Sequence, residues 1–422
     1  MRSVNLSSIM SNVLVFFRKA LIVASSGLLN SLSLFLRMKL FALVGGATGV
    51  GILSLAQSHS NIFIGASSLS AGNTFTRDIA NQESSEELDT LSNCISMGVK
   101  LGFLSALVAC FFWAVTQVNV NSLLPWSISI GLTVFGSANF NQLTYALRGL
   151  SRVDLIAKLN ILVFLFSSLV MMILYLNKLD DLWLYFLVIP CSQGLAIFTI
   201  QEIRKIFSTY AVRGSLPNIF SYLYKNKVAI LFFSTMTVTL CQLLYRVYLG
   251  QIFGLESLGF FQLAFMISSI IMLINTTVMS SVFLPMIAKS TSSSFRSYLF
   301  PLSCQLLINY LCLASVLVLF MFSGEELIVL LASDSLTPAL PVLFSLFLAD
   351  AIRCVASPLA YIAFSKGDVL GFIGADVIAS GSSILILLFF PFETLANTVA
   401  ITQTLAAFLA LVFLLFRIYK VI

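Results

Sequence analysis

The sequence predicts an all-α polytopic membrane protein, with about twelve transmembrane helices in two six-helix bundles. Of its 422 residues, 59% are hydrophobic and only 9% are charged, whereas a soluble domain carries about 25% charged residues. Apolar runs of about 20 residues, the length that spans a bilayer as a helix, recur along the whole chain. Because backbone polar groups in lipid must be bonded within a helix or a closed barrel, runs of this length favour helices.

The apolar runs are separated by short breaks that are polar or rich in glycine, such as Gly45–Gly49 and Ser365–Asp368. The shortest break, Pro391–Thr394, separates the last two runs. We expect spans at about residues 20–43, 49–75, 90–115, 124–147, 154–176, 182–200, 227–250, 257–286, 297–322, 338–364, 369–391 and 393–416.

The basic residues predict the orientation, because lysine and arginine beside a span are retained on the cytoplasmic side. If the N-terminus is cytoplasmic, Lys178 is the only one of the 23 lysines and arginines that falls in an outward loop. An even number of spans then places both termini in the cytoplasm. The first run is too long for a signal peptide, and no pattern of small residues for cleavage follows it.

The longest polar cytoplasmic segment, about residues 201–226, follows the sixth run. It divides the chain into an N-terminal bundle at 1–200 and a C-terminal bundle at 227–422. Its aromatic and basic residues are typical of a helix in the membrane interface, and equally of a solvated linker. The two halves also share a weak pattern, because Arg37 precedes Gly45 by the same spacing that separates Arg246 from Gly254. Parallel halves of this kind place a substrate path between two bundles.

Charged residues within the spans are the main candidates for function, since each costs about 2.5 to 3.5 kcal/mol at the centre of a helix on insertion scales. Cations outnumber acids among them, so a cavity that they line is positive and favours an anionic ligand. For Lys39 and Arg246 the alternative is that the side chain reaches the outer interface. The candidate substrate-binding residues are Arg37, Lys39, Arg246 and Arg353.

Three further residues are candidates for ion coupling or for a structural role. Asp350 and Arg353 are three residues apart, so they share a helix face and can neutralise one another. Asp376 has no cation within four residues of its own helix, and either a coupling proton or a partner on another helix explains it. His59 is the only histidine, and its resting pKa near neutrality suits a switch, although a lone histidine is more often a packing residue.

Nothing in the sequence indicates an enzyme or a bound cofactor. There is no CxxC or HExxH spacing for a metal, and the seven cysteines lie in or beside apolar runs as small hydrophobes. We therefore expect no catalytic residues, no cofactor, no metal and no nucleic-acid partner. A transporter is favoured over a membrane glycosyltransferase or polymerase, because no outward loop is long enough to carry catalytic groups.

Short motifs resemble a known family over nearly the whole chain. The sequence resembles the Wzx-type O-antigen flippases of the multidrug/oligosaccharidyl-lipid/polysaccharide (MOP) exporter superfamily. The motifs are Leu36–Gly45, Tyr145–Leu150, Phe283–Ile287, Leu348–Asp350 and Ala363–Lys366.

The resemblance implies a multi-pass protein of the bacterial inner membrane that takes part in lipopolysaccharide and O-antigen biosynthesis. Its substrate is then an undecaprenyl-pyrophosphate-linked oligosaccharide, moved from the cytoplasmic to the periplasmic leaflet by alternating access. Further implied partners are membrane lipid and other membrane proteins of polysaccharide assembly. On the family pattern, a basic residue in the outer half of the first span corresponds to Lys39, and one late in the seventh to Arg246. The alternative within the same fold is a MATE-like extruder of small molecules, whose cavity is expected to be dominated by acids.

Overall fold

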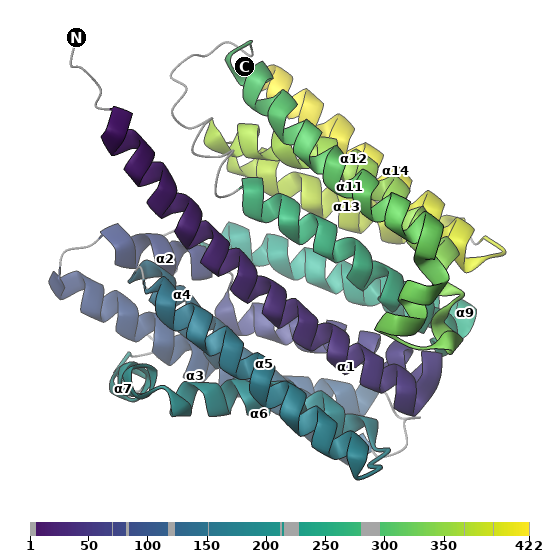
Figure 1. Ribbon diagram of the computed structural model, residues 1–422, viewed down its shortest axis with the longest axis horizontal. Coiled ribbons are helices and arrows are strands. Elements are labelled where there is room, and N and C mark those ends of the chain that lie inside the picture. Colours follow the sequence, from purple (N-terminus) through teal and green to yellow (C-terminus); the bar gives the residue numbers. More distant parts are fainter. Residues whose placement is uncertain are drawn as a thin grey trace. The chain divides into compact units, whose positions relative to one another are not determined.

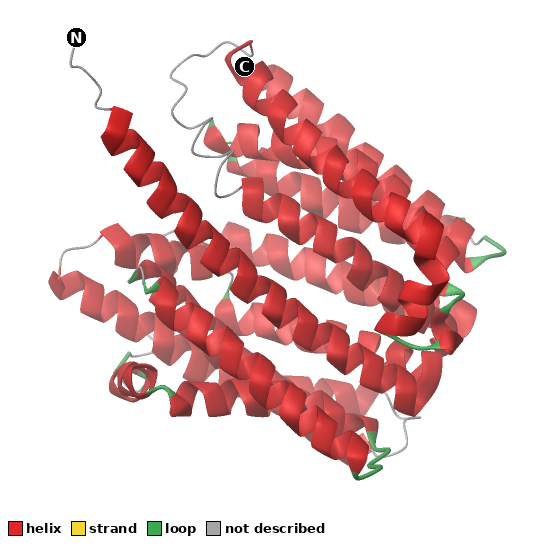
Figure 2. Ribbon diagram, viewed as in Figure 1, coloured by secondary structure: helices red, strands yellow, loops and turns green. Residues whose placement is uncertain are grey.

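The computed structural model is helical, and the residues that it describes form no strand (Figure 2). It describes residues 6–69, 71–81, 84–116, 123–150, 152–211, 213–214, 228–279, 296–366, 368–390 and 392–421. Figure 1 labels the helices along the chain. They are α1 (Leu6–Ser68), α2 (Gly72–Asn81), α3 (Ser84–Thr116), α4 (Leu123–Gly149), α5 (Val153–Leu176), α6 (Leu182–Thr199), α7 (Gln201–Tyr210), α9 (Val228–Val278), α11 (Arg296–Leu331), α12 (Ala339–Ser365), α13 (Val369–Phe389) and α14 (Leu395–Val421).

Ten of the helices in the described ranges are long and apolar enough to cross a membrane. Two of these, α1 and α9, are each a pair of helices joined at a kink. The kink residues are Gly46, with φ 61° and ψ −157°, and Gly254, with φ 84° and ψ 165°. Only glycine adopts such angles without strain, because it has no Cβ. Counting both arms of α1 and of α9 gives the twelve predicted spans, so the predicted fold class is confirmed.

Helix α1 begins at Leu6, before the expected residue 20, and two helices end at residues other than the expected ones. The second arm of α1 ends at Ser68, short of the expected residue 75, because Leu69 has a positive φ of 45° and a separate helix, α2, follows. Helix α11 continues to Leu331, past the expected end at residue 322, through a bend at Ser323. The predicted eighth span, 257–286, extends beyond the described residues after Met279.

The chain forms two compact units. Unit 1 comprises Met1–Arg37 and Phe63–Phe232, and unit 2 comprises Met38–Ile62 and Phe233–Ile422. The segment 38–62 thus packs with the second half of the chain, although the sequence places it in the first bundle. The predicted bundle boundaries, 1–200 and 227–422, stay a prediction.

Unit 1 is held together by small residues where its helices approach closely. Gly98 and Gly102 of α3 lie against α4, where a Cβ on Gly98 would stand 3.1 Å from the side chain of Gln142. Helix α7, at the start of the predicted linker, packs on the core of this unit through buried Ile203 and partly buried Phe207. Its polar side chains, among them Arg204, are exposed. The rest of the linker, 215–226, lies outside the described residues.

In unit 2 the second arms of α1 and α9 cross in a reciprocal contact. A Cβ on Gly51 would overlap the carbonyl of Leu255, and a Cβ on Gly259 would overlap the carbonyl of Ala47. One turn further along each arm, Ser54 donates a hydrogen bond of 2.9 Å to Gln262, 208 residues away. The same separation relates Gly46 to Gly254 and Gly51 to Gly259. Small residues at a helix crossing let the backbones touch, as is common in membranes.

At the end of unit 2 that carries Lys366 and Lys420, Asp368 joins three elements. Its carboxylate caps α13 by accepting a hydrogen bond from the backbone N–H of Gly371, 2.9 Å. It also accepts two hydrogen bonds from Arg417 of α14, of which the one from Nε is 2.9 Å. Hydrogen bonding to Arg417 is the main cause that holds the pKa of the Asp368 carboxyl below its ordinary value.

We predict that Gly51→Ala and Gly259→Ala each destabilise the protein by about 1–3 kcal/mol, because the added methyl group forces the two arms apart. The measurement is the melting temperature of the purified protein in detergent. Gly381→Ala is the matched control, since a Cβ at Gly381 meets nothing within 4 Å. Equal melting temperatures for all three variants and the wild type would contradict the close crossing.

We predict that Asp368→Asn lowers stability at neutral pH by about 1 kcal/mol, because it removes the charge of a partly exposed ion pair. In the wild type the pKa of this carboxyl is lower folded than unfolded. Its contribution is therefore full above the unfolded pKa of about 4 and is lost as the pH falls through the folded value. Melting curves recorded from neutral pH to about pH 3 should converge for the wild type and Asp368→Asn at the acid end. A constant difference across the range would show that the charge of Asp368 contributes nothing.

Candidate functional site

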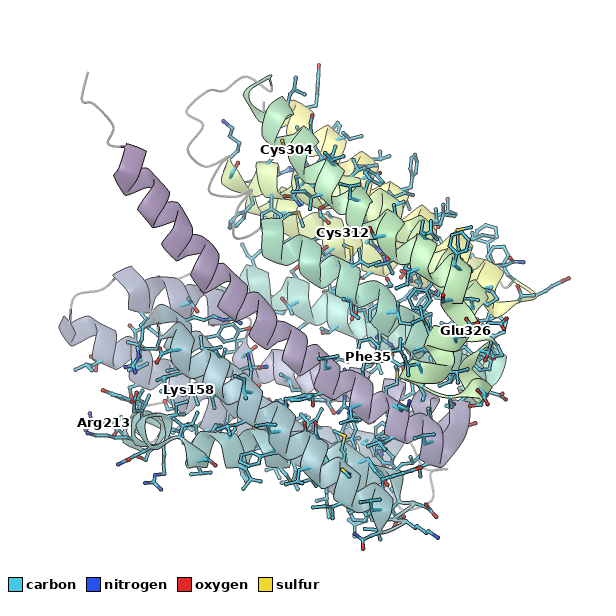
Figure 3. The ribbon with its side chains drawn as sticks, in the orientation of Figure 1. Phe35, Lys158, Arg213, Cys304, Cys312 and Glu326 are labelled. Atoms are coloured by element: carbon cyan, nitrogen blue, oxygen red, sulfur yellow. The ribbon has the colours of Figure 1, made fainter. Side chains whose placement is uncertain are left out.

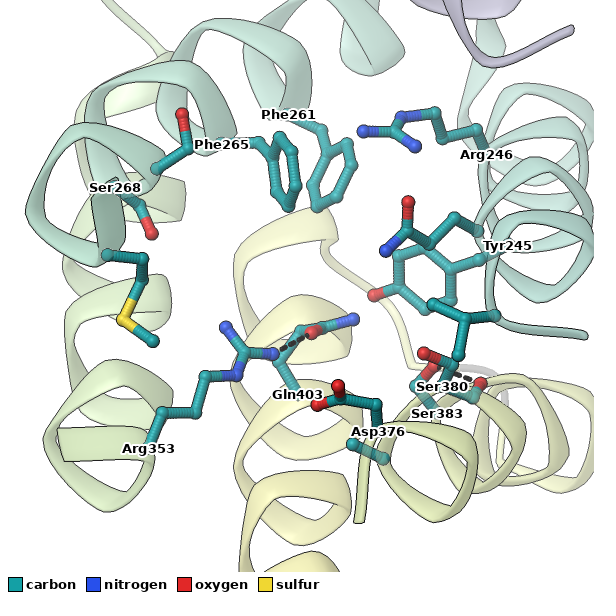
Figure 4. A pocket seen from close by; sticks show the side chains of 15 residues that line it. Tyr245, Arg246, Phe261, Phe265, Ser268, Arg353, Asp376, Ser380, Ser383 and Gln403 are labelled. Carbon is teal, nitrogen blue, oxygen red and sulfur yellow. Dashed lines mark hydrogen bonds between the residues drawn. The ribbon is translucent and has the colours of Figure 1, made fainter. Parts of the chain in front are cut away.

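Unit 2 contains a cavity of about 360 Å³ between α9, α12, α13 and α14. Figure 4 shows side chains from these helices pointing into it. Phe261 and Phe265 of α9 form one wall, and hydroxyl groups of Ser380 and Ser383 on α13 line another part. The polar side chains in its lining include those of Tyr245, Arg246, Ser268, Arg353, Asp376 and Gln403.

Arg246 reaches the cavity from the first arm of α9 and is held there by aromatic rings. Its guanidinium carbon lies 4.8 Å from the ring centre of Phe265 and 5.8 Å from that of Phe261. The two rings are spaced one helical turn apart and stack on each other at 5.8 Å. The residue is only 7% exposed, and its Nε has no hydrogen-bond partner. Arg246 is thus a buried cation with an unused donor beside a cavity.

Arg353 differs from Arg246 because its charge is compensated. Its Nη1 donates to Asp350, 3.0 Å away, and its Nη2 donates to Gln403 at 2.5 Å. Asp350 is fully buried and accepts a second hydrogen bond, of 2.5 Å, from Ser268. The predicted pairing of Asp350 with Arg353 on one helix face is therefore present, and it fixes the direction in which Arg353 points.

Asp376 is the carboxylate in the wall of this cavity. It lies on the first half of α13 and is exposed. The described part of the chain places no cation in ion-pair contact with it. In Figure 4 Arg246 and Arg353 enter from opposite sides, and Asp376 lies near Gln403. The cavity wall thus carries two arginines and one carboxylate, with the Asp350 carboxylate behind Arg353.

The structure does not bring the other candidates to this cavity. Arg37 belongs to unit 1, where it is 4% exposed and lies 5.5 Å from the ring centre of Phe186, with its Nε unpartnered. Lys39 donates a hydrogen bond of 2.5 Å to the carbonyl of Leu330 in the last turn of α11. A lysine there satisfies a carbonyl that the helix end leaves free and suits the negative end of the helix dipole. His59 is buried in the second arm of α1 and does not line the cavity.

The spacing of the two arginines also differs from the expected one. The glycine with positive φ is Gly46 rather than Gly45, so Arg246 corresponds to Met38 and Arg37 to Tyr245 in the repeat. One residue is about 100° of rotation on a helix. Arg37 and Arg246 therefore do not occupy equivalent helix faces.

Sequence analysis missed the aromatic and hydroxyl groups of the site. Phe261 and Phe265 have the spacing of helix-face neighbours, but a chain with 38 phenylalanines contains many such pairs. Tyr245, next to Arg246 in the sequence, was not predicted as a site residue. Its hydroxyl lies 2.7 Å from that of Thr402 on α14. The amide side chains of Gln242 and Gln403 also line the cavity.

We predict that Asp350→Ala destabilises the protein by about 2 kcal/mol, because it removes a charge-assisted hydrogen bond and leaves Arg353 without a counter-charge. The double variant with Arg353→Ala should recover part of the loss. Thermal melting of the two single variants and the double variant in detergent gives the coupling between the residues. Additive effects would show that the pair does not stabilise the fold.

Solved structures with the same fold include transporters and a flippase. The chain matches lipid II flippase MurJ in an inward closed conformation with a TM-score of 0.70 and 13% identity, over 95% of this chain and 90% of that one. It matches an inward-facing multidrug resistance MATE transporter of the MOP superfamily with a TM-score of 0.66 and 12% identity, over 96% and 94%. An outward-facing MATE transporter of that superfamily matches with a TM-score of 0.56 and 12% identity, over 96% of each chain.

No protein-family model matches the sequence, and no curated protein matches it. At identities of 12% and 13%, the likeness to solved structures shows a shared fold. The chain is therefore a polytopic membrane protein with the fold of MATE transporters and of MurJ.

Proposed function

We propose that the protein is a flippase that moves an undecaprenyl-pyrophosphate-linked oligosaccharide from the cytoplasmic to the periplasmic leaflet. The observation that carries the proposal is Arg246, a buried guanidinium held by two aromatic rings, with an unpartnered Nε beside a cavity of about 360 Å³. A buried cation without a carboxylate partner is costly in a membrane, and an anionic substrate removes that cost when it binds.

The remaining groups suit a phosphate joined to a sugar. Guanidinium groups bind phosphate oxygens through two parallel hydrogen bonds, and Arg246 retains the donors for this. The amide of Gln403 and the hydroxyls of Ser380 and Ser383 offer hydrogen bonds to sugar hydroxyls, and the rings of Phe261 and Phe265 offer apolar contact. Arg353 contributes positive charge but shares it with Asp350, so it serves as a second contact rather than the anchor.

The shared fold supports a transporter over an enzyme. Among the proteins of this fold is a flippase for lipid II, and MATE transporters of the same fold occur in inward-facing and outward-facing conformations. Alternating access between two such states is the mechanism we propose here. We also propose Arg37 and Lys39 as substrate contacts. Arg37 has an unpartnered Nε and no carboxylate contact among the described residues.

The proposed location is the bacterial inner membrane with both termini in the cytoplasm. It rests on the distribution of basic residues, of which only Lys178 falls in a predicted outward loop. The proposed partners are the lipid-linked substrate, the surrounding membrane lipid and other membrane proteins of polysaccharide assembly.

One observation favours a second function, the extrusion of a small cationic molecule in the manner of a MATE transporter. Asp376 is exposed in the cavity wall and has no ion-pair partner among the described residues. Together with the aromatic wall, it offers an amphipathic cation both a counter-charge and a ring face. Arg246 opposes this function, because the cavity then presents a cation to a cation.

We predict that vesicles containing the purified protein move a fluorescent lipid-linked oligosaccharide to the far leaflet, measured by protection from a membrane-impermeant quencher. Arg246→Ala should lower the initial rate about tenfold or more, because it removes a charge-assisted contact to the pyrophosphate. Arg246→Lys should give an intermediate rate, since it keeps the charge but loses the planar contact with the rings.

The charge-matched control is Arg213→Ala, because Arg213 is an exposed residue just after α7 (Figure 3). Its rate should equal that of the wild type. Wild-type vesicles that leave the lipid-linked oligosaccharide in place but export a cationic dye, with loss of export in Asp376→Asn, would establish the extruder instead.

A further inference from the structure

A second cavity of about 230 Å³ adjoins the first in unit 2. The two share wall residues, among them Met272, Arg353 and Asp376. Apart from this shared boundary the second cavity is lined mainly by apolar side chains, of which the alanines are small and Met279, Phe372 and Leu414 are large. The alanines in its wall are Ala356, Ala360, Ala375, Ala379, Ala407 and Ala410.

The two cavities follow one another along the helices. On α12, Arg353 is shared, while Ala360 and Tyr361 of the second cavity lie closer to the end at Ser365. On α14, Gln403 lines the first cavity, and Ala407, Ala410 and Leu414 line the second, nearer the end with Arg417. Helix α13 runs the opposite way and keeps the same order, since Phe372 lines the second cavity and Ser383 the first. On all three helices the apolar cavity therefore lies nearer the ends at Ser365, Val369 and Arg417, and the polar cavity lies farther from them.

The membrane orientation follows from the charges at the helix ends. The second cavity lies toward the ends that carry Lys366, Arg417 and Lys420, which the positive-inside rule places in the cytoplasm. The polar cavity with Arg246 is therefore on the outward side of the apolar one. A lipid in the cytoplasmic leaflet has the reverse arrangement, with its polar group toward the cytoplasm.

We propose that the two cavities form one site for an isoprenoid pyrophosphate, with the pyrophosphate at Arg246 and the first part of the hydrocarbon chain in the alanine-lined cavity. The inference rests on the proposed function and adds the posture of the substrate. An amphiphile held in this way already has its polar group directed outward. That is the orientation it has in the periplasmic leaflet, so this site binds the substrate after it has turned over.

The lining of the second cavity fits a hydrocarbon chain better than it fits water or a second polar group. An apolar cavity stays dry, and its wall gains dispersion contacts when an apolar group enters it and fills the empty space. Alanine methyl groups leave the space open, whereas larger side chains at these positions would occupy it. Tyr361 and Ser357 lie in this wall as well, so the lining is largely apolar rather than entirely so.

Photolabelling of the wild-type protein in vesicles tests the posture directly. The probe is a polyprenyl pyrophosphate with a diazirine on its first isoprene unit. When the labelled residues are located by fragmenting the peptides, they should be those that line the second cavity, namely Ala360 on α12 and Ala407 and Ala410 on α14. Labelling of lipid-facing residues alone, such as Leu405 and Phe408, would overturn the proposal.

A phosphatidylglycerol with a diazirine near its glycerol is the control for ordinary membrane lipid, and it should leave the residues that line the second cavity unlabelled. Equal labelling by both lipids would overturn the proposal in favour of a general lipid site. Neither result depends on the folding of a variant.

A cavity-filling variant tests the contribution of the chain to affinity. Ala407→Leu should weaken binding of the polyprenyl pyrophosphate about tenfold, because the larger side chain fills space in the second cavity that the hydrocarbon chain would occupy and removes its packing contacts. Binding of inorganic pyrophosphate should not change. The matched control is Ala400→Leu, in the same helix but lining neither cavity. Unchanged affinity of Ala407→Leu for the polyprenyl pyrophosphate would overturn the proposal.

The outcomes also separate this inference from the proposed function. The wild-type protein can flip the lipid-linked oligosaccharide while neither the labelling nor Ala407→Leu places the hydrocarbon chain in the second cavity. That result would support the flippase function and contradict the proposed orientation of the bound substrate. Wild-type protein that does not flip the oligosaccharide removes the function itself, whatever the labelling shows.

Discussion

The constraint on which this structure depends is the absence of water in the lipid around it. Every backbone polar group within the bilayer must find its partner inside a helix, and every charge must be neutralised or kept near a water-filled space. The helices satisfy the first demand. Asp350 and Arg353 satisfy the second by pairing with each other and with Ser268 and Gln403. Lys39 satisfies it by bonding to a helix end.

Arg37 and Arg246 depart from this pattern, because neither has a carboxylate partner among the described residues. Of the two, only Arg246 lines the cavity, and the proposed function therefore rests on it. Aromatic rings stabilise a guanidinium by about 2 kcal/mol or more when water is excluded, but they do not cancel its charge. A site held in this state prefers an anion by its nature. The Asp376 carboxylate in the same cavity wall reduces the positive charge of the cavity. An anion that binds at Arg246 is therefore held less tightly and can be released.

Much of the fold was predictable from the sequence because a bilayer admits so few structures. A run of apolar residues of the right length leaves a helix as the only choice, and the break at Gly45–Gly49 marks the kink to within a residue of Gly46. The packing of residues 38–62 with the second half was not predictable. It depends on the contact of Gly51 with a carbonyl far along the chain, and local patterns carry no information about such contacts.

The site was predictable in part for a related reason. Arg246 and Arg353 stand out because charges are rare within spans, whereas Phe261 and Phe265 are hidden among many similar residues. Only the structure shows that Arg353 is paired with a carboxylate and that Arg246 is not. Lys39 shows the limit most clearly, because its partner is a backbone carbonyl 291 residues away, and backbone groups are the same at every position of the sequence.

The reciprocal crossing of the two second arms has the symmetry of a dimer interface within a single chain. Gly51 meets Leu255 and Gly259 meets Ala47, so each half presents the same pair of positions to the other. A contact of this kind is isologous, the form that two identical subunits make across a two-fold axis. The two halves of this chain therefore meet at the crossing as two copies of one subunit would.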